Sequence, residues 1–313
     1  KIMLQITTGQ TLGAYRVLNF LGRGAFAQVF LAESPSGELV ALKMGDESGG
    51  GQYLPRFGEV TGERNPSGVS PDETPAEALF LDPQEGAKAE LLDCHEVDEL
   101  LRNEAEILKS ADGCGLPKLL ELFELGSRPV LVMEYIEGAT LREKIRSLEG
   151  IKLGWLVEVS RTLECLQGLG WECHGDVKPE NIMVTLDERV VLLDPMPSAT
   201  RSDEVLATPW YNPFLRHDSK GDTQSLAILL YELLCGCLPF DEAPFRYAGM
   251  PKNACSEDDR GLALSMYLAY PKPREVNAHA PRELERIIYR CLCDEAYGLA
   301  DFRLDLEDFL AKI

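Results

Sequence analysis

Four polar side chains near the middle of the chain have the types and the order that phosphoryl transfer requires. Asp176, Lys178 and Asn181 lie within one short segment, and Asp194 ends an apolar stretch thirteen positions after Asn181. In such a reaction one carboxylate orients the attacking hydroxyl, a cation steadies the γ-phosphate, and an amide and a second carboxylate hold Mg²⁺. A turn rich in Asp, Pro and Asn between two strands would explain the same residues without any chemistry.

The N-terminal part of the chain adds residues suited to holding phosphates. A strand-like stretch at 15–21 leads into Gly22 and Gly24. Glycines allow backbone N–H groups to approach a phosphate closely, although G-x-G alone is most often a hairpin turn. A short apolar strand then ends at Lys43, and Glu104 follows on a helical pattern. A strand lysine that pairs with a helix glutamate and with the α/β-phosphates is the arrangement of protein kinases.

In this order the motifs resemble the signature of eukaryotic-type (Hanks-type) Ser/Thr protein kinases, over nearly all of the chain. They are Gly22-Arg-Gly24, Val40-Ala-Leu-Lys43, His174-Gly-Asp-Val-Lys-Pro-Glu-Asn181 and Val191-Leu-Leu-Asp194. The resemblance implies an α+β, two-lobed fold, with an N-lobe of antiparallel strands and one main helix and a mainly helical C-lobe. The chain has 313 residues, of which 45% are hydrophobic, and this is enough to form one two-lobed unit with a sizeable core.

The resemblance places the N-lobe at 1–134 and the C-lobe at 135–313, with an insertion at about 45–92. This Gly-, Pro- and Ser-rich insertion separates Lys43 from the helix of Glu104. It is either a solvated loop or a segment that docks on the lobe and binds a regulatory partner. Further elements are expected at 97–108 (helix), 129–133 (strand), 134–138 (hinge), 141–145 and 155–169 (helices), 181–193 (hairpin), and 225–235, 281–293 and 304–313 (helices).

The resemblance also assigns a role to each candidate residue. Asp176 is the catalytic base, and Lys178 is the γ-phosphate cation that marks Ser/Thr rather than Tyr kinases. Lys43 contacts the α/β-phosphates of ATP and pairs with Glu104. The expected Mg²⁺ ligands are Asn181 and Asp194, and the expected ATP-binding residues are Gly22, Gly24, Ala27, Val29, Ala41, Lys43, Met133, Glu134, Ile136 and Met183. Two further features are a substrate segment at Thr208-Pro-Trp-Tyr211 and a buried Asp222 that steadies the catalytic loop.

Five departures from the family pattern have predictable consequences. Gly175 replaces the arginine before the catalytic base, which makes control by a phosphate on the activation segment unexpected. The others are Ala27 for the third loop glycine, Pro195-Met196 for Phe-Gly, Pro213-Phe214 for Pro-Glu, and Gln224 for a tryptophan. The usual buried Glu–Arg pair is expected to be absent. None of the five removes a phosphate or metal ligand.

Charge narrows the range of partners. The chain has 31 Lys and Arg against 52 Asp and Glu, a net charge of −21, which disfavours nucleic acid and anionic membranes. The charge suits a basic protein substrate with a Ser or Thr acceptor, or is simply a solvating acidic surface. The longest apolar run, at 226–235, is too short to insert in a membrane.

The nine cysteines lie mostly in apolar surroundings, which favours free core thiols and a cytoplasmic location. The absence of a signal peptide at residues 1–5 agrees with that location. Cys165 lies alone, and two C-x-C pairs, Cys235 with Cys237 and Cys291 with Cys293, fall in helical runs, where i and i+2 side chains point apart. A zinc site is therefore the less favoured alternative.

Three activities are compatible with these features. The first is an active ATP- and Mg²⁺-dependent Ser/Thr protein kinase, which the complete phosphoryl-transfer set favours. The second is a pseudokinase or scaffold that binds nucleotide without turnover, suggested by Pro195-Met196. The third is small-molecule phosphotransfer, since some such enzymes share the His-Gly-Asp motif. The protein-substrate segment at 208–211 disfavours the third.

Overall fold

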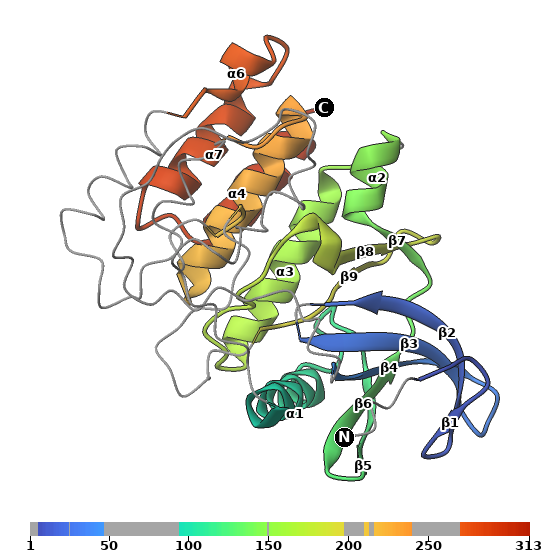
Figure 1. The fold of residues 1–313 in the computed structure, drawn as a ribbon. Helices are drawn as coiled ribbons and strands as arrows, with labels where there is room; N and C mark the ends of the chain where they lie inside the picture. The colour runs from blue at the N-terminus through green and yellow to red at the C-terminus, as the bar shows by residue number, and fades with distance from the viewer. Residues whose placement is uncertain are drawn as a thin grey trace, which may run out of the picture.

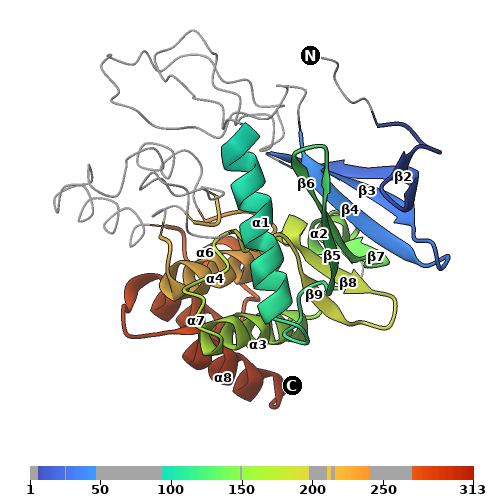
Figure 2. The same cartoon turned by 90° about the horizontal axis from the view of Figure 1, so that it is seen from below.

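The computed structural model describes residues 6–24, 26–46, 94–148, 150–196, 210–212, 216–239 and 270–313. Within these ranges an antiparallel sheet is followed by a mainly helical part, which confirms the predicted α+β kinase fold (Figures 1 and 2). Nearly all of the expected insertion, all of residues 197–209, and Pro213-Phe214 lie outside the described residues.

Six antiparallel strands form the N-terminal sheet in the order β1-β2-β3-β4-β6-β5. The strands are β1 (Thr11–Leu12), β2 (Tyr15–Arg23), β3 (Ala27–Glu33), β4 (Leu39–Gly45), β5 (Leu119–Leu125) and β6 (Arg128–Glu134). Every residue of β4 after Leu39 is buried, as expected for a strand with an almost continuous apolar sequence. Lys43 is carried into the interior by that strand.

Helix α1 (Cys94–Ser110) packs beside the sheet (Figure 2). Its buried residues recur at helical spacing, at Val97, Leu100, Leu101, Glu104, Ala105 and Leu108. Glu104 therefore lies on the apolar face that meets the sheet. Near its start, Asp98 accepts a hydrogen bond of 2.7 Å from Arg128 Nε of β6, which ties the helix to that strand.

The C-terminal part consists mainly of helices packed around α4. They are α2 (Leu141–Ser147), α3 (Gly154–Gly168), α4 (Ser219–Cys235), α6 (Pro273–Val276), α7 (Arg282–Cys293) and α8 (Leu299–Leu310). Helix α4 begins earlier than the predicted Ser225, because the Asp218 side chain caps it by accepting from the Gly221 N–H. Thr140 caps α2 as predicted, with Glu143 completing a capping box.

A small sheet of β7 (Gly138–Thr140), β8 (Ile182–Thr185) and β9 (Val190–Leu192) lies between the large sheet and the helices. Strands β8 and β9 pair antiparallel from Ile182↔Leu192 to Val184↔Val190, which confirms the predicted hairpin. A 3-10 turn, η1 (Pro179–Asn181), leads directly into β8. The loop that ends α3 and the residues after β9 are thereby brought together.

The prediction of free cysteines in apolar surroundings is wrong for Cys165. This residue is exposed and forms a disulfide with Cys114, in the segment that follows α1. On α3 the apolar face is formed by residues such as Leu163 and Leu166, and Cys165 lies away from it, toward the loop of Cys114. Cys237 is also exposed, whereas Cys291 is free and buried as predicted.

None of the helices within the described ranges has the length and apolar character needed to cross a membrane.

Candidate active site

Lys43 connects three segments that are far apart in the sequence. Its Nζ lies 2.8 and 2.7 Å from the two carboxylate oxygens of Glu104, on α1, and 2.9 Å from Oδ1 of Asp194, just after β9. Lys43 and Glu104 are only 4% and 2% exposed. Because one ammonium holds the buried carboxylate of Glu104 and the partly exposed carboxylate of Asp194, the strand, the helix and the segment after β9 are held in a fixed relation.

Electrostatics fix the charges in this cluster. Burial opposes the ammonium, but Asp194 and Glu104 outweigh it and raise the pKa of Lys43. Burial likewise opposes ionisation of Asp194, but Lys43 and then Lys178 outweigh it and lower the pKa of that carboxyl. Burial raises the pKa of Glu104 to about 7, against the attraction of Lys43. Lys43 is therefore cationic and Asp194 anionic at neutral pH.

The loop between α3 and β8 brings together two predicted catalytic residues, Asp176 and Lys178, and the predicted metal ligand Asn181. Asn181 Nδ2 donates to the backbone oxygen of Asp176 at 2.9 Å and to its Oδ2 at 3.0 Å. Lys178 Nζ lies 2.7 Å from the same Oδ2. A carboxylate, a cation and an amide thus face one another. The Leu193 N–H donates to the Asn181 carbonyl at 2.7 Å, which places this group beside Asp194.

Asp222 holds the start of this loop from the first turn of α4. Its two carboxylate oxygens accept from the N–H groups of His174 at 2.7 Å and Gly175 at 3.0 Å, as predicted for a buried aspartate that steadies the loop. Burial raises the pKa of Asp222 to about 7, although the two N–H groups favour the anion. The carboxylate therefore satisfies backbone donors that would otherwise be buried without a partner.

His174 links the loop to the segment that carries Asp194. Its Nδ1 accepts from the Asp176 N–H at 3.3 Å, and its Nε2 lies 3.0 Å from the Leu193 carbonyl. Burial lowers the pKa of His174 to about 4, so the ring is neutral and Nε2 carries the proton that it donates to Leu193. A further bond runs from the Met196 N–H to the His174 carbonyl at 2.8 Å.

The structure explains why glycine stands before Asp176. Gly175 has φ of +87°, and a Cβ atom there would lie 3.0 Å from Cε1 of His217 and 3.2 Å from the Met196 carbonyl oxygen. An arginine, as in the common family pattern, would need both a strained backbone and a displaced His217. The packing of the loop therefore favours glycine at position 175, where the family pattern has arginine.

We predict that Gly175→Ala destabilises the protein by about 1–3 kcal/mol, because a side chain is forced into a left-handed backbone conformation. The matched control is Gly154→Ala at the start of α3, where a Cβ atom would meet nothing within 4 Å. Urea unfolding of both variants measures the difference. Equal stabilities of the two variants would show that the position tolerates a side chain.

Most of the residues predicted to surround the nucleotide lie on the neighbouring strands β3, β4 and β6 or in the segment that follows β6. Ala41 pairs with Met133 and Val29 with Lys43 in the strand ladders. Ile136 follows in the segment between β6 and β7. The remaining predicted residues are Gly22, opposite Val29; Gly24, whose N–H donates to the Ala27 carbonyl; Glu134, at the end of β6; and Met183, opposite Thr140.

Sequence reasoning missed a charged network centred on Arg142 of α2. Its guanidinium donates to Glu180 at 2.7 Å, to Glu232 of α4 at 2.5 Å and to the Tyr211 hydroxyl. Tyr211 in turn donates to Glu232 at 2.6 Å. The network joins the catalytic loop, the predicted substrate segment and α4. Arg142 lies two residues after the predicted cap Thr140, but nothing in the sequence pattern pairs it with the other members of the network.

A separate hollow of about 490 Å³ lies beside the end of β6 and the residue that follows it. It is lined by the start of β4, residues of the segment 112–118, Glu134-Tyr135 and Arg189-Val190. Glu134 is the one predicted nucleotide residue among its lining residues, so this hollow is distinct from the cluster around Lys43.

Comparisons with known proteins agree with this geometry. The family described as "Protein kinase domain" matches residues 87–297. The chain is 29% identical over 199 residues to the probable serine/threonine-protein kinase CPE1738 of Clostridium perfringens, covering 56% of this chain and 26% of that protein. It is 24% identical over 251 residues to the serine/threonine-protein kinase PrkC of Bacillus subtilis, covering 74% of this chain and 37% of that protein. The chain thus spans well under half the length of these relatives.

A solved structure has the same fold. The kinase domain of PknI from Mycobacterium tuberculosis aligns with a TM-score of 0.58 and 18% identity, over 99% of this chain and all of that one. The family match starts at residue 87 and so leaves out Gly22, Gly24 and Lys43, yet the structure joins Lys43 to Glu104 within the matched part. By the family match over most of its length and by its fold, the chain belongs to the protein kinase family.

Proposed function

We propose that the chain is an ATP- and Mg²⁺-dependent Ser/Thr protein kinase that transfers the γ-phosphate to protein hydroxyls. The observation that carries this proposal is the Lys43 ammonium, held by Glu104 and Asp194 at 2.7–2.9 Å. This is the arrangement in which a strand lysine is positioned for the α/β-phosphates. The Ser/Thr class is supported by Lys178 and by the kinases to which the chain is similar.

The donor set beside Lys43 fits Mg²⁺. Asp194 offers an ionised carboxylate, and Asn181 offers an amide oxygen, because its Nδ2 is engaged with Asp176. Hard oxygen ligands of this kind suit a small divalent cation that also binds phosphate. When bound, the ion would neutralise charge on the phosphate oxygens. The same carboxylate of Asp194 would remain oriented by Lys43.

Asp176 is the residue proposed to receive the proton of the substrate hydroxyl. Its carboxylate is fixed by Asn181, and its backbone by His174. Lys178, 2.7 Å from Asp176 Oδ2, would place a cation beside the attacking oxygen and balance charge on the transferred phosphoryl group. Adenine would lie among Val29, Ala41, Ile136, Met133 and Met183 and would meet the backbone at 134–136.

A nucleotide-binding pseudokinase is the second candidate, because Pro195-Met196 replaces the Phe-Gly of the family pattern after Asp194. Asp194 has φ of +55° and is followed by Pro195 and by a buried Met196. ATP turnover by the purified chain, measured with and without Mg²⁺, separates the two functions. Turnover that requires Mg²⁺ supports the kinase, whereas nucleotide binding without turnover supports the pseudokinase.

We further propose how the chain divides into two lobes, which kind of protein it acts on, and where it is located. The N-lobe would comprise 1–134 and the C-lobe 135–313, with the nucleotide between them. The partner would be a protein with a Ser or Thr acceptor, and the net charge of −21 suits a basic one. The inserted segment at about 45–92 would bind a regulatory partner, and the location would be cytoplasmic.

Replacing residues 48–88 with a short Gly/Ser linker is predicted to leave ATP binding and basal turnover in place. The reason is that Lys43 and Glu104 flank the insertion, and each is held by elements outside it. A phosphorylated or partner-bound insertion would then act on the position of α1 rather than on the chemistry. Nucleotide titration of the variant measures this. Loss of ATP binding in the folded variant would make the insertion part of the nucleotide site.

A further inference from the structure

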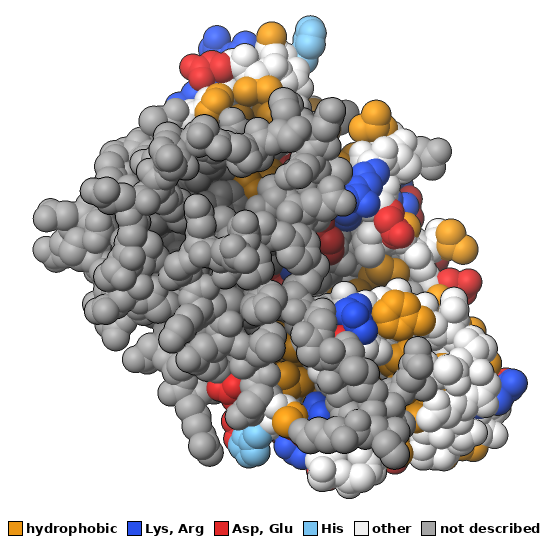
Figure 3. All heavy atoms as spheres, in the orientation of Figure 1, with side chains coloured by type: hydrophobic (Ala, Val, Ile, Leu, Met, Phe, Trp, Pro, Cys, Tyr) orange, Lys and Arg blue, Asp and Glu red, His pale blue; other side chains and the backbone are white. Residues whose placement is uncertain are grey.

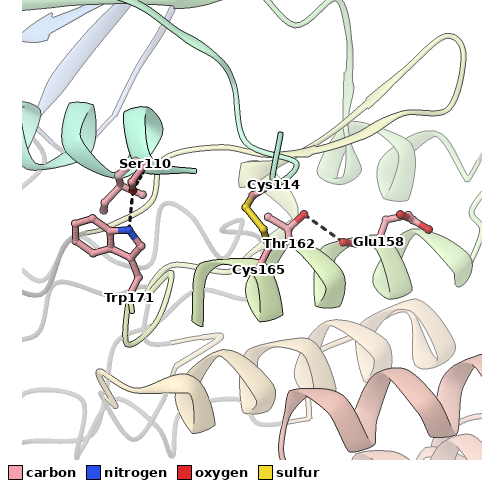
Figure 4. Close-up of a disulfide and its surroundings, with 7 residues drawn as sticks. Ser110, Cys114, Glu158, Thr162, Cys165 and Trp171 are labelled. Atoms are coloured by element: carbon pink, nitrogen blue, oxygen red, sulfur yellow. Dashed lines mark hydrogen bonds between the residues drawn. A yellow bond between two sulfur atoms is a disulfide. The ribbon is translucent and has the colours of Figure 1, made fainter. Parts of the chain in front are cut away.

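We propose that the Cys114–Cys165 disulfide is a redox-controlled tie, which fixes the C-terminal end of α1 on α3 and thereby stabilises the Lys43–Glu104 pair. Cys114 lies in the segment after α1, and Cys165 lies on α3 (Figure 4). Their Cα atoms are 5.7 Å apart, within the range of ordinary disulfides. The bridge thus joins the helix of Glu104 to the helix that leads into the catalytic loop.

The segment around Cys114 is seated closely on its neighbours. Gly115 has φ of +86°, and a Cβ atom there would lie 2.3 Å from Oγ1 of Thr162, one turn before Cys165 on α3. The Gly115 carbonyl accepts from the Leu192 N–H of β9 at 2.9 Å. At the end of α1, Trp171 Nε1 donates to Ser110 Oγ at 2.9 Å, beside the bridge (Figure 4). Non-covalent contacts therefore hold the segment around Cys114 against α3 and β9, and the disulfide adds a covalent bond to α3.

The C-terminal end of α1, which the disulfide holds, is part of the same continuous helix as Glu104. The turn after α1 continues the helix, with hydrogen bonds from Ala111 N–H to the Ile107 carbonyl and from Cys114 N–H to the Ala111 carbonyl. Glu104 lies about 9 Å from Ser110 along the helix axis. An end fixed in this way limits how far the helix can swing and carry Glu104 away from Lys43. Loss of the bridge leaves only the non-covalent contacts to hold that end.

The exposure of the two cysteines permits thiol–disulfide exchange. Cys165 is exposed, whereas Cys114 is only 9% exposed. The thiolate of a dithiol reductant attacks Sγ of Cys165, the S–S bond breaks, and Cys114 leaves as a thiolate that takes up a proton. The second thiol of the reductant then closes its own disulfide and releases Cys165. Two electrons and two protons pass from the reductant to the bridge, and a disulfide of the same class reverses the step.

The use of cysteine in the rest of the chain favours a switch over a permanent staple. Among the described residues, Cys94, Cys235, Cys291 and Cys293 are free thiols. Free thiols of this kind are typical of proteins kept in reducing surroundings. In such proteins an isolated bridge is usually transient and redox-sensing.

The test compares the full chain after incubation with dithiothreitol and after oxidation with trans-4,5-dihydroxy-1,2-dithiane. Hydrogen exchange of the amides of α1 and the rate of phosphoryl transfer to a protein substrate are measured in both states. Reduction is expected to speed exchange in α1 at least threefold and to lower the transfer rate at least threefold. Cys165→Ser should match the reduced protein in both states. The matched control, Cys94→Ser with Cys237→Ser, should respond to redox as the original chain does.

Several results would overturn the proposal. Equal α1 exchange in the two redox states would do so, as would a redox response that persists in Cys165→Ser. If reduction or Cys165→Ser unfolds the whole chain, as seen by circular dichroism, the bridge is a structural staple and not a switch. The effect on rate rests on the proposed phosphoryl transfer, but α1 exchange is measured without nucleotide. Redox-dependent exchange without transfer in either state would therefore support the tie and contradict only the proposed function.

Discussion

Replacing Lys43 by methionine, or Asp194 by asparagine, is expected to lower phosphoryl transfer at least about 100-fold. Lys43 contacts both Glu104 and Asp194, so its loss removes the proposed cation for the phosphates and the orientation of the proposed metal ligand. Asp194→Asn removes the ionised carboxylate that would hold Mg²⁺. Initial rates with a basic protein substrate measure both effects.

Both variants are expected to remain folded. Methionine keeps the apolar stem of Lys43 in its buried strand, and Glu104, with its pKa already raised to about 7, takes up a proton when the cation is gone. The matched control is Lys152→Met, since Lys152 forms an exposed ion pair with Glu188. Rates within twofold of the original in Lys43→Met would contradict the assigned site, whereas the control should keep its rate.

Asp222→Ala is expected to cost about 2–4 kcal/mol of stability, because it leaves two buried backbone N–H groups without a partner. It should also lower phosphoryl transfer about tenfold or more, since His174 and Gly175 begin the loop that carries Asp176. Urea unfolding and initial rates, measured at a temperature where the variant is folded, give the two quantities separately.

Asp218→Ala provides the comparison within the same helix. Asp218 caps α4 by accepting from Gly221 and pairs with Arg216. Loss of a cap costs about 1 kcal/mol. We expect Asp218→Ala to lose stability with little change in rate. A rate loss as large as that of Asp222→Ala would show that the start of α4 acts on the loop only through general stability.

The sequence allowed the central contacts of the site to be predicted because they follow from local patterns in a fixed order. Lys43 ends a short apolar strand, and Glu104 lies on the apolar face of an amphipathic helix. Strand and helix periodicities each place one side chain inward, and the kinase resemblance pairs them across the insertion. Asp222, which opens the apolar core helix, was predicted from the kinase resemblance alone.

Other contacts could not be predicted, because they depend on how separate elements meet in space. Cys114 and Cys165 are 51 residues apart, and their approach depends on Gly115 fitting against Thr162. Arg142 meets Glu232 only because α2 and α4 both approach the catalytic loop. His217 fills the space beside Gly175 from the start of α4. None of these pairs has a periodicity or spacing that marks it in a single sequence.

The central claim is that Asp176, Lys43 and Asp194 form a working phosphoryl-transfer site. The most direct measurement incubates the chain with ATP and Mg²⁺ and a basic protein substrate, and maps the phosphorylated residues by mass spectrometry, with Asp176→Asn as the matched control. We predict phosphoserine and phosphothreonine with the original chain and nearly none with Asp176→Asn. Equal phosphorylation by both proteins, or none by the original chain while it binds ATP, would contradict it.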